Sequence, residues 1–356
     1  MNRAAALLSL ALVSSAGAAA PTSLTVWIPE QGQTATLSSA GLVGAAGNRL
    51  VLNQPEYTLP VERPIAGGFA RLVNPTNGAP TRLEIVQRGK VTASRAFPEA
   101  VYSTYLRGTQ RGPCLSYAAD GREGVTRCFT PDLKTEWAKL GGVMTITRDG
   151  QAAYMYDTAK NRIGAAYQPN LHIIRQNLTT GEQTPLTYRV PLDDKELEYH
   201  RNLAATYEVG DSISWGAELP GGRFVLCAST TLPKMYCRLD IVNRDLKRLA
   251  TLQGSAYVST PSATADGKRL YFMGNTLQVW EANTGKRLSA IRDPLWEKRG
   301  QVPLKAYLTP DGTQAAILVK GMKNGHADYS ADDSKETAYL YRVQGGKLLN
   351  SFPVKP

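Results

Sequence analysis

Residues and motifs that support common enzyme chemistry are scarce in this chain of 356 residues. Only three histidines are present, and there is neither a G-x-S-x-G nucleophile motif nor a glycine-rich phosphate loop. The cysteines form no C-x-x-C pair and have no histidine at zinc-ligand spacing. We therefore expect no metal site, and no catalytic or cofactor-binding residue can be named, which favours a binding protein over an enzyme.

Helical periodicity and membrane-spanning runs are almost absent as well. Only residues 192–208 carry a pattern that predicts a helix. After residue 20, no apolar run is long enough to cross a bilayer. We expect a mostly β-strand protein whose mature chain has no transmembrane segment.

The first twenty residues have the pattern of a secretory signal peptide. A basic residue, Arg3, precedes an apolar run from Ala4 to Val13, and small residues follow. We predict cleavage after Ala18 or Ala20, and an uncleaved anchor is the alternative. The mature chain, residues 21–356, is then a single domain that is secreted or located in the periplasm or cell envelope.

There are only four cysteines. Cys114 and Cys128 bracket an Asp-Gly turn, and Cys227 and Cys237 bracket a turn whose midpoint is Leu232. A hairpin centred on either turn places its two cysteines directly opposite each other on neighbouring strands, within reach of a disulfide. We predict the structural disulfides Cys114–Cys128 and Cys227–Cys237, which fit an oxidising compartment.

The chain has a formal net charge of +11, from 41 basic and 30 acidic residues. A basic surface favours acidic partners, so an anionic polymer is a candidate partner. No block of Lys and Arg is interleaved with aromatic residues, and we therefore expect no nucleic-acid binding.

A short pattern recurs along the chain, in which a turn glycine precedes an apolar run. Gly150, Gly222, Gly267 and Gly312 each open such a run, and Gly47 opens one with the same Gly-x-Arg-Leu as Gly267. From Gly222 to Gly267 is 45 residues, and from Gly267 to Gly312 is again 45. A fixed spacing of this size is typical of repeat folds.

Each unit also has a second turn rich in Gly, Asn and Asp, which tight turns between strands require. These second turns lie at residues 86–91, 177–183, 242–249, 281–288 and 343–349. The residues between turns alternate or run apolar, as in strands. The repeat therefore predicts an all-β fold, a β-propeller of four-stranded blades. Its length fits seven blades, with six or eight as alternatives and paired β-sandwiches as a different fold.

The segment LQVWEANTGKRL resembles the last strand of a WD-repeat blade, with Trp280 and Glu281 at the Trp-Asp position. The turns TADG and TPDG are similar to those of bacterial WD-repeat-like, YVTN and quinoprotein-type propellers. The resemblance covers residues 210–352 and implies a secreted propeller. The chain lacks the Gly-His dipeptide of WD repeats and the vicinal cysteines of quinoproteins, so the resemblance assigns no cofactor residue.

Acidic residues cluster in two segments of the chain. They are Asp193, Asp194, Glu196 and Glu198, and further along Asp328, Asp332, Asp333 and Glu336. Neither cluster has EF-type calcium spacing with its central glycine, so we interpret both as solvated loops. Calcium held on the propeller axis by carboxylates of several blades is the alternative.

Large aromatic residues and two insertions complete the candidates. The tryptophans Trp27, Trp137, Trp215, Trp280 and Trp296 are expected to fill space between blades rather than bind sugar. At least one of the insertions at residues 185–211 and 321–337 is expected to border the binding face. The strand at residues 23–29 is predicted to complete the last blade by pairing near residues 337–343.

These patterns together predict a secreted β-propeller that acts as a binding or scaffolding module of the cell envelope, with a protein as its partner. The alternative is an envelope enzyme or cofactor-binding protein, quinoprotein-like or calcium-dependent, that uses the propeller axis. Acidic or Arg and Trp side chains that converge on the axis favour this alternative. Binding of a polyanion through surface charge is a third hypothesis and predicts steep salt dependence.

Overall fold

The computed structural model of the protein describes most of the chain between residues 21 and 354. The described residues are 21–29, 32–44, 49–50, 61–73, 81–97, 101–119, 124–157, 159–160, 170–190, 195, 198, 212–230, 236–253, 261–323, 326–327 and 336–354. The predicted signal peptide, residues 1–20, lies outside them. Among the residues described, no helix is both long enough and apolar enough to span a membrane.

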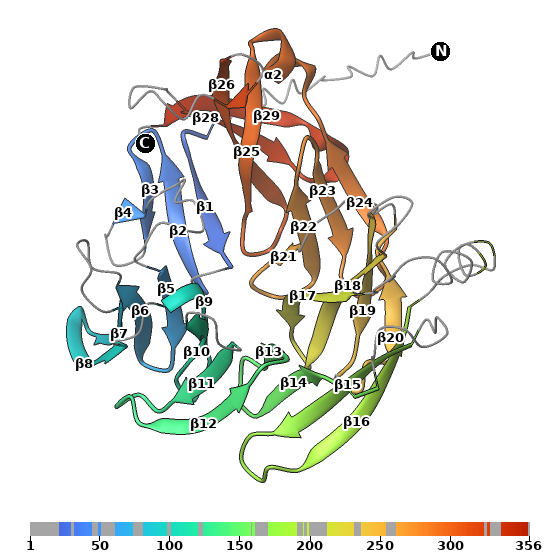
Figure 1. Ribbon diagram of the computed structural model, residues 1–356. Helices are drawn as coiled ribbons and strands as arrows, with labels where there is room; N and C mark the ends of the chain where they lie inside the picture. Colours follow the sequence, from blue (N-terminus) through green and yellow to red (C-terminus); the bar gives the residue numbers. More distant parts are fainter. Residues whose placement is uncertain are drawn as a thin grey trace, which may run out of the picture.

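The strands form seven antiparallel sheets around a common axis, and each sheet consists of consecutive strands of the chain (Figure 1). Blades 1 and 2 contain β1 (Ser23–Ile28), β2 (Gln33–Ser38), β3 (Gly41–Gly44) and β4 (Arg49–Leu50), then β5 (Val61–Ile65), β6 (Gly68–Val73), β7 (Thr81–Gln87) and β8 (Lys90–Phe97). Blades 3 and 4 contain β9 (Val101–Gly108), β10 (Pro113–Ala119), β11 (Val125–Phe129) and β12 (Thr135–Leu140), then β13 (Val143–Ile146), β14 (Ala152–Tyr156), β15 (Asn170–Asn177) and β16 (Gln183–Arg189).

Blades 5 to 7 follow the same order. Blades 5 and 6 contain β17 (Ser212–Leu219), β18 (Arg223–Thr230), β19 (Tyr236–Val242) and β20 (Arg248–Thr251), then β21 (Ser262–Ala263), β22 (Arg269–Met273), β23 (Leu277–Glu281) and β24 (Arg287–Ile291). Blade 7 contains β25 (Gln301–Leu308), β26 (Gln314–Lys323), β28 (Glu336–Arg342) and β29 (Leu348–Val354), with the short β27 (His326–Ala327) paired to β26. The predicted fold of seven four-stranded blades is confirmed, and six or eight blades and paired sandwiches are wrong.

The turn glycines that define the repeat lie between the first and second strands of their blades. Gly150, Gly222, Gly267 and Gly312 have φ angles of 71°, 68°, 63° and 67°, which glycine adopts without strain. At Gly267 a Cβ atom would also lie 2.1 Å from Cδ of Pro220. The predicted second turns lie between the third and fourth strands, so both turn predictions are confirmed for these units.

The prediction from Gly47 is wrong. Gly47 itself lies outside the described residues, but it falls between the third and fourth strands of blade 1 and so cannot open a second strand. The glycines that hold this place in blades 1 to 3 are Gly32, Gly67 and Gly112, all with positive φ. Their turns lack the Asp-Gly sequence found in blades 4, 6 and 7, which is why the repeat is faint there.

Three of the first turns share the sequence Thr-x-Asp-Gly, at residues 147–150, 264–267 and 309–312. In each, the threonine hydroxyl donates to the aspartate at 2.5 to 2.8 Å, and the aspartate accepts the backbone N–H two residues further on at 2.9 to 3.0 Å. Burial raises the pKa of the three aspartates, but these hydrogen bonds outweigh burial and hold each pKa below its ordinary value. The turns are therefore stabilised by the ionised carboxylate.

Apolar side chains of neighbouring blades form the core. Trp280 is fully buried between blades 5 and 6, and its indole Nε1 donates to the carbonyl of Gln253 at 2.9 Å. Its strand, β23, is the third of its blade, so the expectation of a last strand is wrong. Trp296 is also buried, as predicted, whereas Trp27 and Trp137 are half-buried. The side chain of Trp215 lies outside what the structure describes.

The ring closes without exchange of a strand, so the predicted clasp is wrong. The first strand, β1, pairs with β2 of its own blade, and β28 pairs only with β26 and β29. Blade 1 and blade 7 lie side by side (Figure 1), and a buried cluster from both blades joins them, including Val26, Leu37 and Leu318. The Asn350 amide also donates to the carbonyl of Pro21 at 2.7 Å.

The helical content differs from the prediction. Within residues 192–208 only Lys195 and Glu198 are described, and both are helical. A second helix, α2 (Pro294–Lys298), precedes blade 7 and was not predicted. It is a single turn, too short for periodicity to reveal, and it is held in place by Trp296, whose ring meets Tyr339 and Tyr341 edge-on.

The disulfide predictions have different outcomes. Cys114 lies directly opposite Cys128 on β10 and β11, and the two are bonded. Cys227 is disulfide-bonded, but the side chain of Cys237 lies outside the described residues, so that pairing stays a prediction. The expected register is wrong, because Leu239 rather than Cys237 lies opposite Cys227. The hairpin register is centred on residue 233, one residue beyond Leu232.

Candidate functional site

A cavity of about 520 Å³ opens on the propeller axis. It is lined by the C-terminal ends of β1, β5, β9, β17 and β21 and by the turn that follows β13. The first strands contact one another around the axis, as at the pairs β5–β9, β13–β17, β17–β21 and β1–β25. Their ends therefore meet at one mouth, where side chains from six blades converge on the same space.

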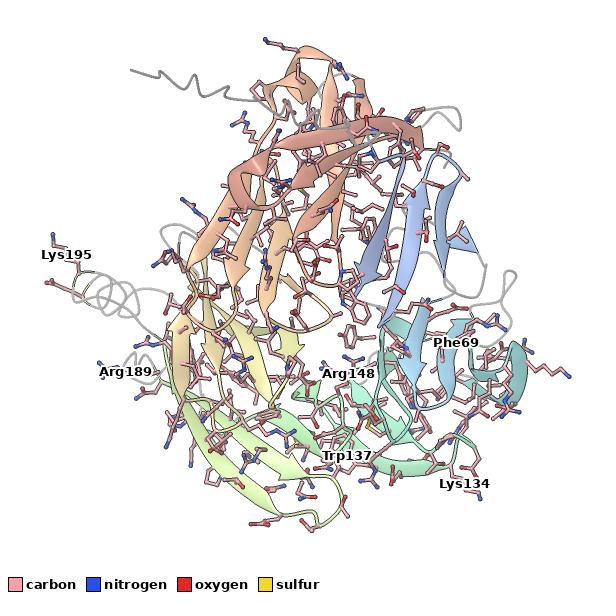
Figure 2. All side chains as sticks on the ribbon, turned by 180° about the vertical axis from the view of Figure 1, so that it is seen from behind. Phe69, Lys134, Trp137, Arg148, Arg189 and Lys195 are labelled. Atoms are coloured by element: carbon pink, nitrogen blue, oxygen red, sulfur yellow. A yellow bond between two sulfur atoms is a disulfide. The ribbon has the colours of Figure 1, made fainter. Side chains whose placement is uncertain are left out.

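Positive charge dominates this axial cavity. The described lining contains Arg63, Arg107, Arg148 and Arg244, against the two carboxylates Asp149 and Glu218. Guanidinium groups stay protonated at every relevant pH, so their excess persists. Figure 2 shows Arg148 toward the middle of the ring, whereas Arg189 lies at its outer edge.

Glu218 is the partly buried anchor of the cavity wall. Its Oε2 atom accepts the backbone N–H of Arg148 at 2.7 Å and lies 3.4 Å from Nη2 of Arg107. Burial raises the pKa of Glu218, and the Arg107 charge partly offsets this. Arg107 also donates to the Thr145 hydroxyl at 2.5 Å, so these contacts tie blades 3, 4 and 5 together at the mouth.

Asp149 neutralises a second arginine. Its Oδ2 atom lies 2.7 Å from Nη2 of Arg244, while Oδ1 accepts the hydrogen bonds of the Thr-x-Asp-Gly turn. Gly222 allows Arg244 to lie close to its backbone, because a Cβ there would approach Nε of Arg244 to 2.1 Å. Both carboxylates of the lining are therefore committed to arginines and to backbone N–H groups.

Two arginines keep their charge without a carboxylate partner in the described part of the chain. The Arg148 guanidinium is exposed to the cavity and makes no hydrogen bond or ion pair with a described residue. The only described hydrogen bond of the Arg63 guanidinium runs to the carbonyl of Glu62, at 2.9 Å. Arginine is well suited to bind carboxylate or phosphate groups, often in bidentate fashion. This arrangement offers hydrogen-bond donors that an anion could accept.

A second cavity, which we call the side chamber, has a volume of about 310 Å³ and lies between blades 3 and 4. Tyr105 and Arg107 line both the axial cavity and the side chamber, so the two spaces adjoin. The side chain of Tyr105 is 58% exposed, and Trp27 lies elsewhere on the axial wall. An aromatic surface and an apolar recess thus accompany the arginines.

Few of the candidate site residues predicted from the sequence lie at the two cavities. Of the tryptophans, Trp27 lines the axial cavity. Cys114 contributes to the side chamber, while His172 lies on β15 with its ring beside the Thr187 hydroxyl. The acidic clusters lie mostly outside the described residues, and only Glu198 and Glu336 of their members are described. No group of three metal-ligating side chains occurs among the residues that are described.

Sequence reasoning did not find the four arginines or Glu218. They are far apart in the chain and come together only through the ring, so no local spacing marks them. One local signal was present in the Thr-x-Asp-Gly turns. Their second residue is Ala265 or Pro310 in two cases, but it is Arg148 in blade 4. A charged residue at the second position of a Thr-x-Asp-Gly turn could therefore have indicated the axial cavity as a binding site.

The fold and cavity define a seven-bladed β-propeller. No protein-family model matches the chain, and neither does any curated protein sequence. Among solved structures, the chain is similar to dihydro-heme d1 dehydrogenase NirN in complex with DHE, with a TM-score of 0.46 and 11% identity over 93% of this chain and 66% of that one. It is also similar to Kluyveromyces lactis Hsv2, with a TM-score of 0.46 and 10% identity over 94% of this chain and all of that one.

Proposed function

We propose that the protein is a secreted binding module of the cell envelope, residues 21–356 forming one propeller domain, and that it binds an anionic ligand in the axial cavity. The observation that carries this proposal is the pair Arg63 and Arg148, which face one cavity without a carboxylate partner among the described residues. The disulfide Cys114–Cys128 and the signal-like first twenty residues support the location.

The geometry favours binding over a chemical step. Glu218 and Asp149, the only described carboxylates of the lining, are already engaged by Arg107, by Arg244 and by backbone N–H groups. The arginines, by contrast, present donors to the open space. The arginines and Trp27 that converge on the axis are the feature expected for the alternative, a cofactor-binding protein or enzyme that uses the propeller axis. They shift the proposed binding site from the insertion loops to the axial cavity, and a protein partner would reach this site with an acidic group.

Calorimetric titration with acetate and with inorganic phosphate, at constant ionic strength, tests the proposal. The double variant Arg63→Gln/Arg148→Gln is expected to bind about tenfold to a hundredfold more weakly than the native protein, because hydrogen bonds to charged groups contribute about 1.5–3 kcal/mol. Arg189→Gln on β16 is the control for each of the single variants Arg63→Gln and Arg148→Gln, since it removes one positive charge from the outer edge of the ring. Equal loss of affinity in the control and in each single variant would instead support polyanion binding through overall surface charge.

A further inference from the structure

The side chamber lies beside a small buried cluster between blades 3 and 4. The cluster consists of Cys114, Cys128, Ile146 and Ala153, with Trp137, Val143 and Leu178 packed against it. The junction of blades 6 and 7, by comparison, holds Trp296 and three tyrosines. The side chamber, of about 310 Å³, opens toward the axial cavity at Tyr105, so a ligand in the axial cavity can reach it.

The lining of the side chamber is mostly apolar. Val143 and Ile146 of β13 form one wall, whereas Met144, which also borders the chamber, packs against the cluster between blades 4 and 5. Tyr105 lies at the border with the axial cavity. Among the polar members, the Ser116 hydroxyl is already hydrogen-bonded to Thr126 at 2.8 Å. Apolar recesses of this kind bind apolar groups in preference to water.

Arg107 stands where the two spaces adjoin. Its Nη2 atom is 3.4 Å from Glu218, well beyond the 2.7–2.9 Å of a strong charge-assisted hydrogen bond. The same Glu218 oxygen accepts the backbone N–H of Arg148 at 2.7 Å, so the backbone of Arg148 lies beside Arg107. The Arg148 guanidinium extends from there to Gly32 of blade 1, where Nη2 lies 3.1 Å from the position of an ideal Cβ. A carboxylate between these groups would meet Arg107, which Thr145 holds in place and whose contact with Glu218 is long, and Arg148, which has no carboxylate partner among the described residues.

We infer that the ligand is an amphiphilic carboxylate, whose charged group binds at Arg107 and Arg148 and whose aliphatic or aryl part enters the side chamber past Tyr105. This inference rests on the proposed anion site and adds the ligand class to it. Each methylene that enters the chamber is expected to strengthen binding about fourfold, which corresponds to about 0.8 kcal/mol. The uncharged analogue has no partner for the arginines and binds weakly.

Calorimetric titration with the series acetate, butanoate, hexanoate and octanoate tests the inference, with 1-octanol as the uncharged control. The native protein is expected to bind the longer acids progressively more tightly and 1-octanol much more weakly than octanoate. Val143→Phe and, independently, Ser116→Phe are expected to fill the chamber and to abolish the dependence on chain length while acetate binding persists. Arg148→Gln is expected to weaken the whole series by a common factor.

The outcomes separate the two proposals. Equal affinity for all four acids overturns the amphiphile inference but leaves the anion site intact. Failure of every acid to bind overturns both. Binding of 1-octanol as tight as that of octanoate overturns the role of Arg107 and Arg148. Should one chamber variant fold poorly, as judged by its thermal melt, the other variant and the chain-length series of the native protein still decide the question.

Discussion

The junction between blades 1 and 7 is expected to open more readily than any junction that the chain itself crosses. Val26 and Leu318 are fully buried in the cluster that closes the ring, and no backbone hydrogen bond between paired strands crosses it. Val225 and Leu270 are equally buried between blades 5 and 6, where the chain continues from one blade to the next. Leu318→Ala and Leu270→Ala therefore form a matched pair.

The magnitude follows from the packing. Truncation of a fully buried leucine to alanine costs about 3–5 kcal/mol. If the ring opens locally, this loss lowers the opening free energy of the closing junction and raises the open population about a hundredfold to several thousandfold. In Leu270→Ala the same loss acts mainly on global unfolding, because blades 5 and 6 cannot separate without movement of their connecting chain.

Reaction of a buried thiol with a soluble thiol reagent measures these openings. The thiol of a Val26→Cys variant reports on the closing junction, and that of a Val225→Cys variant reports on the control junction. We expect Leu318→Ala to accelerate labelling at residue 26 far more than at residue 225. Equal acceleration at both positions would mean that the ring opens only by global unfolding and would refute the reasoning.

Three further predictions concern stability, each measured by equilibrium unfolding in urea. In the native protein, the pKa of the Asp311 carboxyl lies below its ordinary value, so the ionised carboxylate stabilises the fold above about pH 4, and this contribution is lost as the pH falls through the folded-state pKa. Asp311→Asn removes the contribution, so the difference in unfolding free energy between variant and native protein should shrink below about pH 4. A difference that stays constant with pH would contradict this. In Trp280→Phe, the carbonyl of Gln253 loses the hydrogen bond from the indole, and we expect a loss of about 0.5–1.5 kcal/mol; no loss would show that the indole contact is dispensable. Replacement of both Cys114 and Cys128 by serine opens a loop with a sequence separation of 14 and is expected to cost about 3 kcal/mol, whereas an unchanged midpoint would exclude a stabilising role.

Most of the fold could be predicted from the turn residues that recur along the sequence. Positive φ at Gly222, Gly267 and Gly312 requires glycine, and their even spacing reveals the period of the blades. The Cys114–Cys128 pairing followed from the midpoint of a short hairpin. Both are short-range features, in which sequence separation and spatial separation are tightly linked.

Long-range features were not accessible in the same way. A strand such as β1 has the same alternating pattern whether it pairs with its own blade or with the last one, so ring closure could not be read from it. The predicted strand register of the hairpin between Cys227 and Cys237 was wrong by one residue at the centre of the turn. The five residues between β18 and β19 are centred on Pro233 and not on Leu232. The arginines of the axial cavity come from blades 2, 3 and 5 and from the β13–β14 turn, and only the closed ring brings them together.

The Thr-x-Asp-Gly turn has a consequence for how this protein could change over evolution. Its threonine, aspartate and glycine hold the backbone, while the second residue takes no part in those hydrogen bonds. At residues 148 and 265 that second residue lines the axial cavity. Ligand preference can therefore be altered by substitutions at positions that cost the blade little, which makes the propeller a scaffold whose specificity and stability reside in different residues of the same turn.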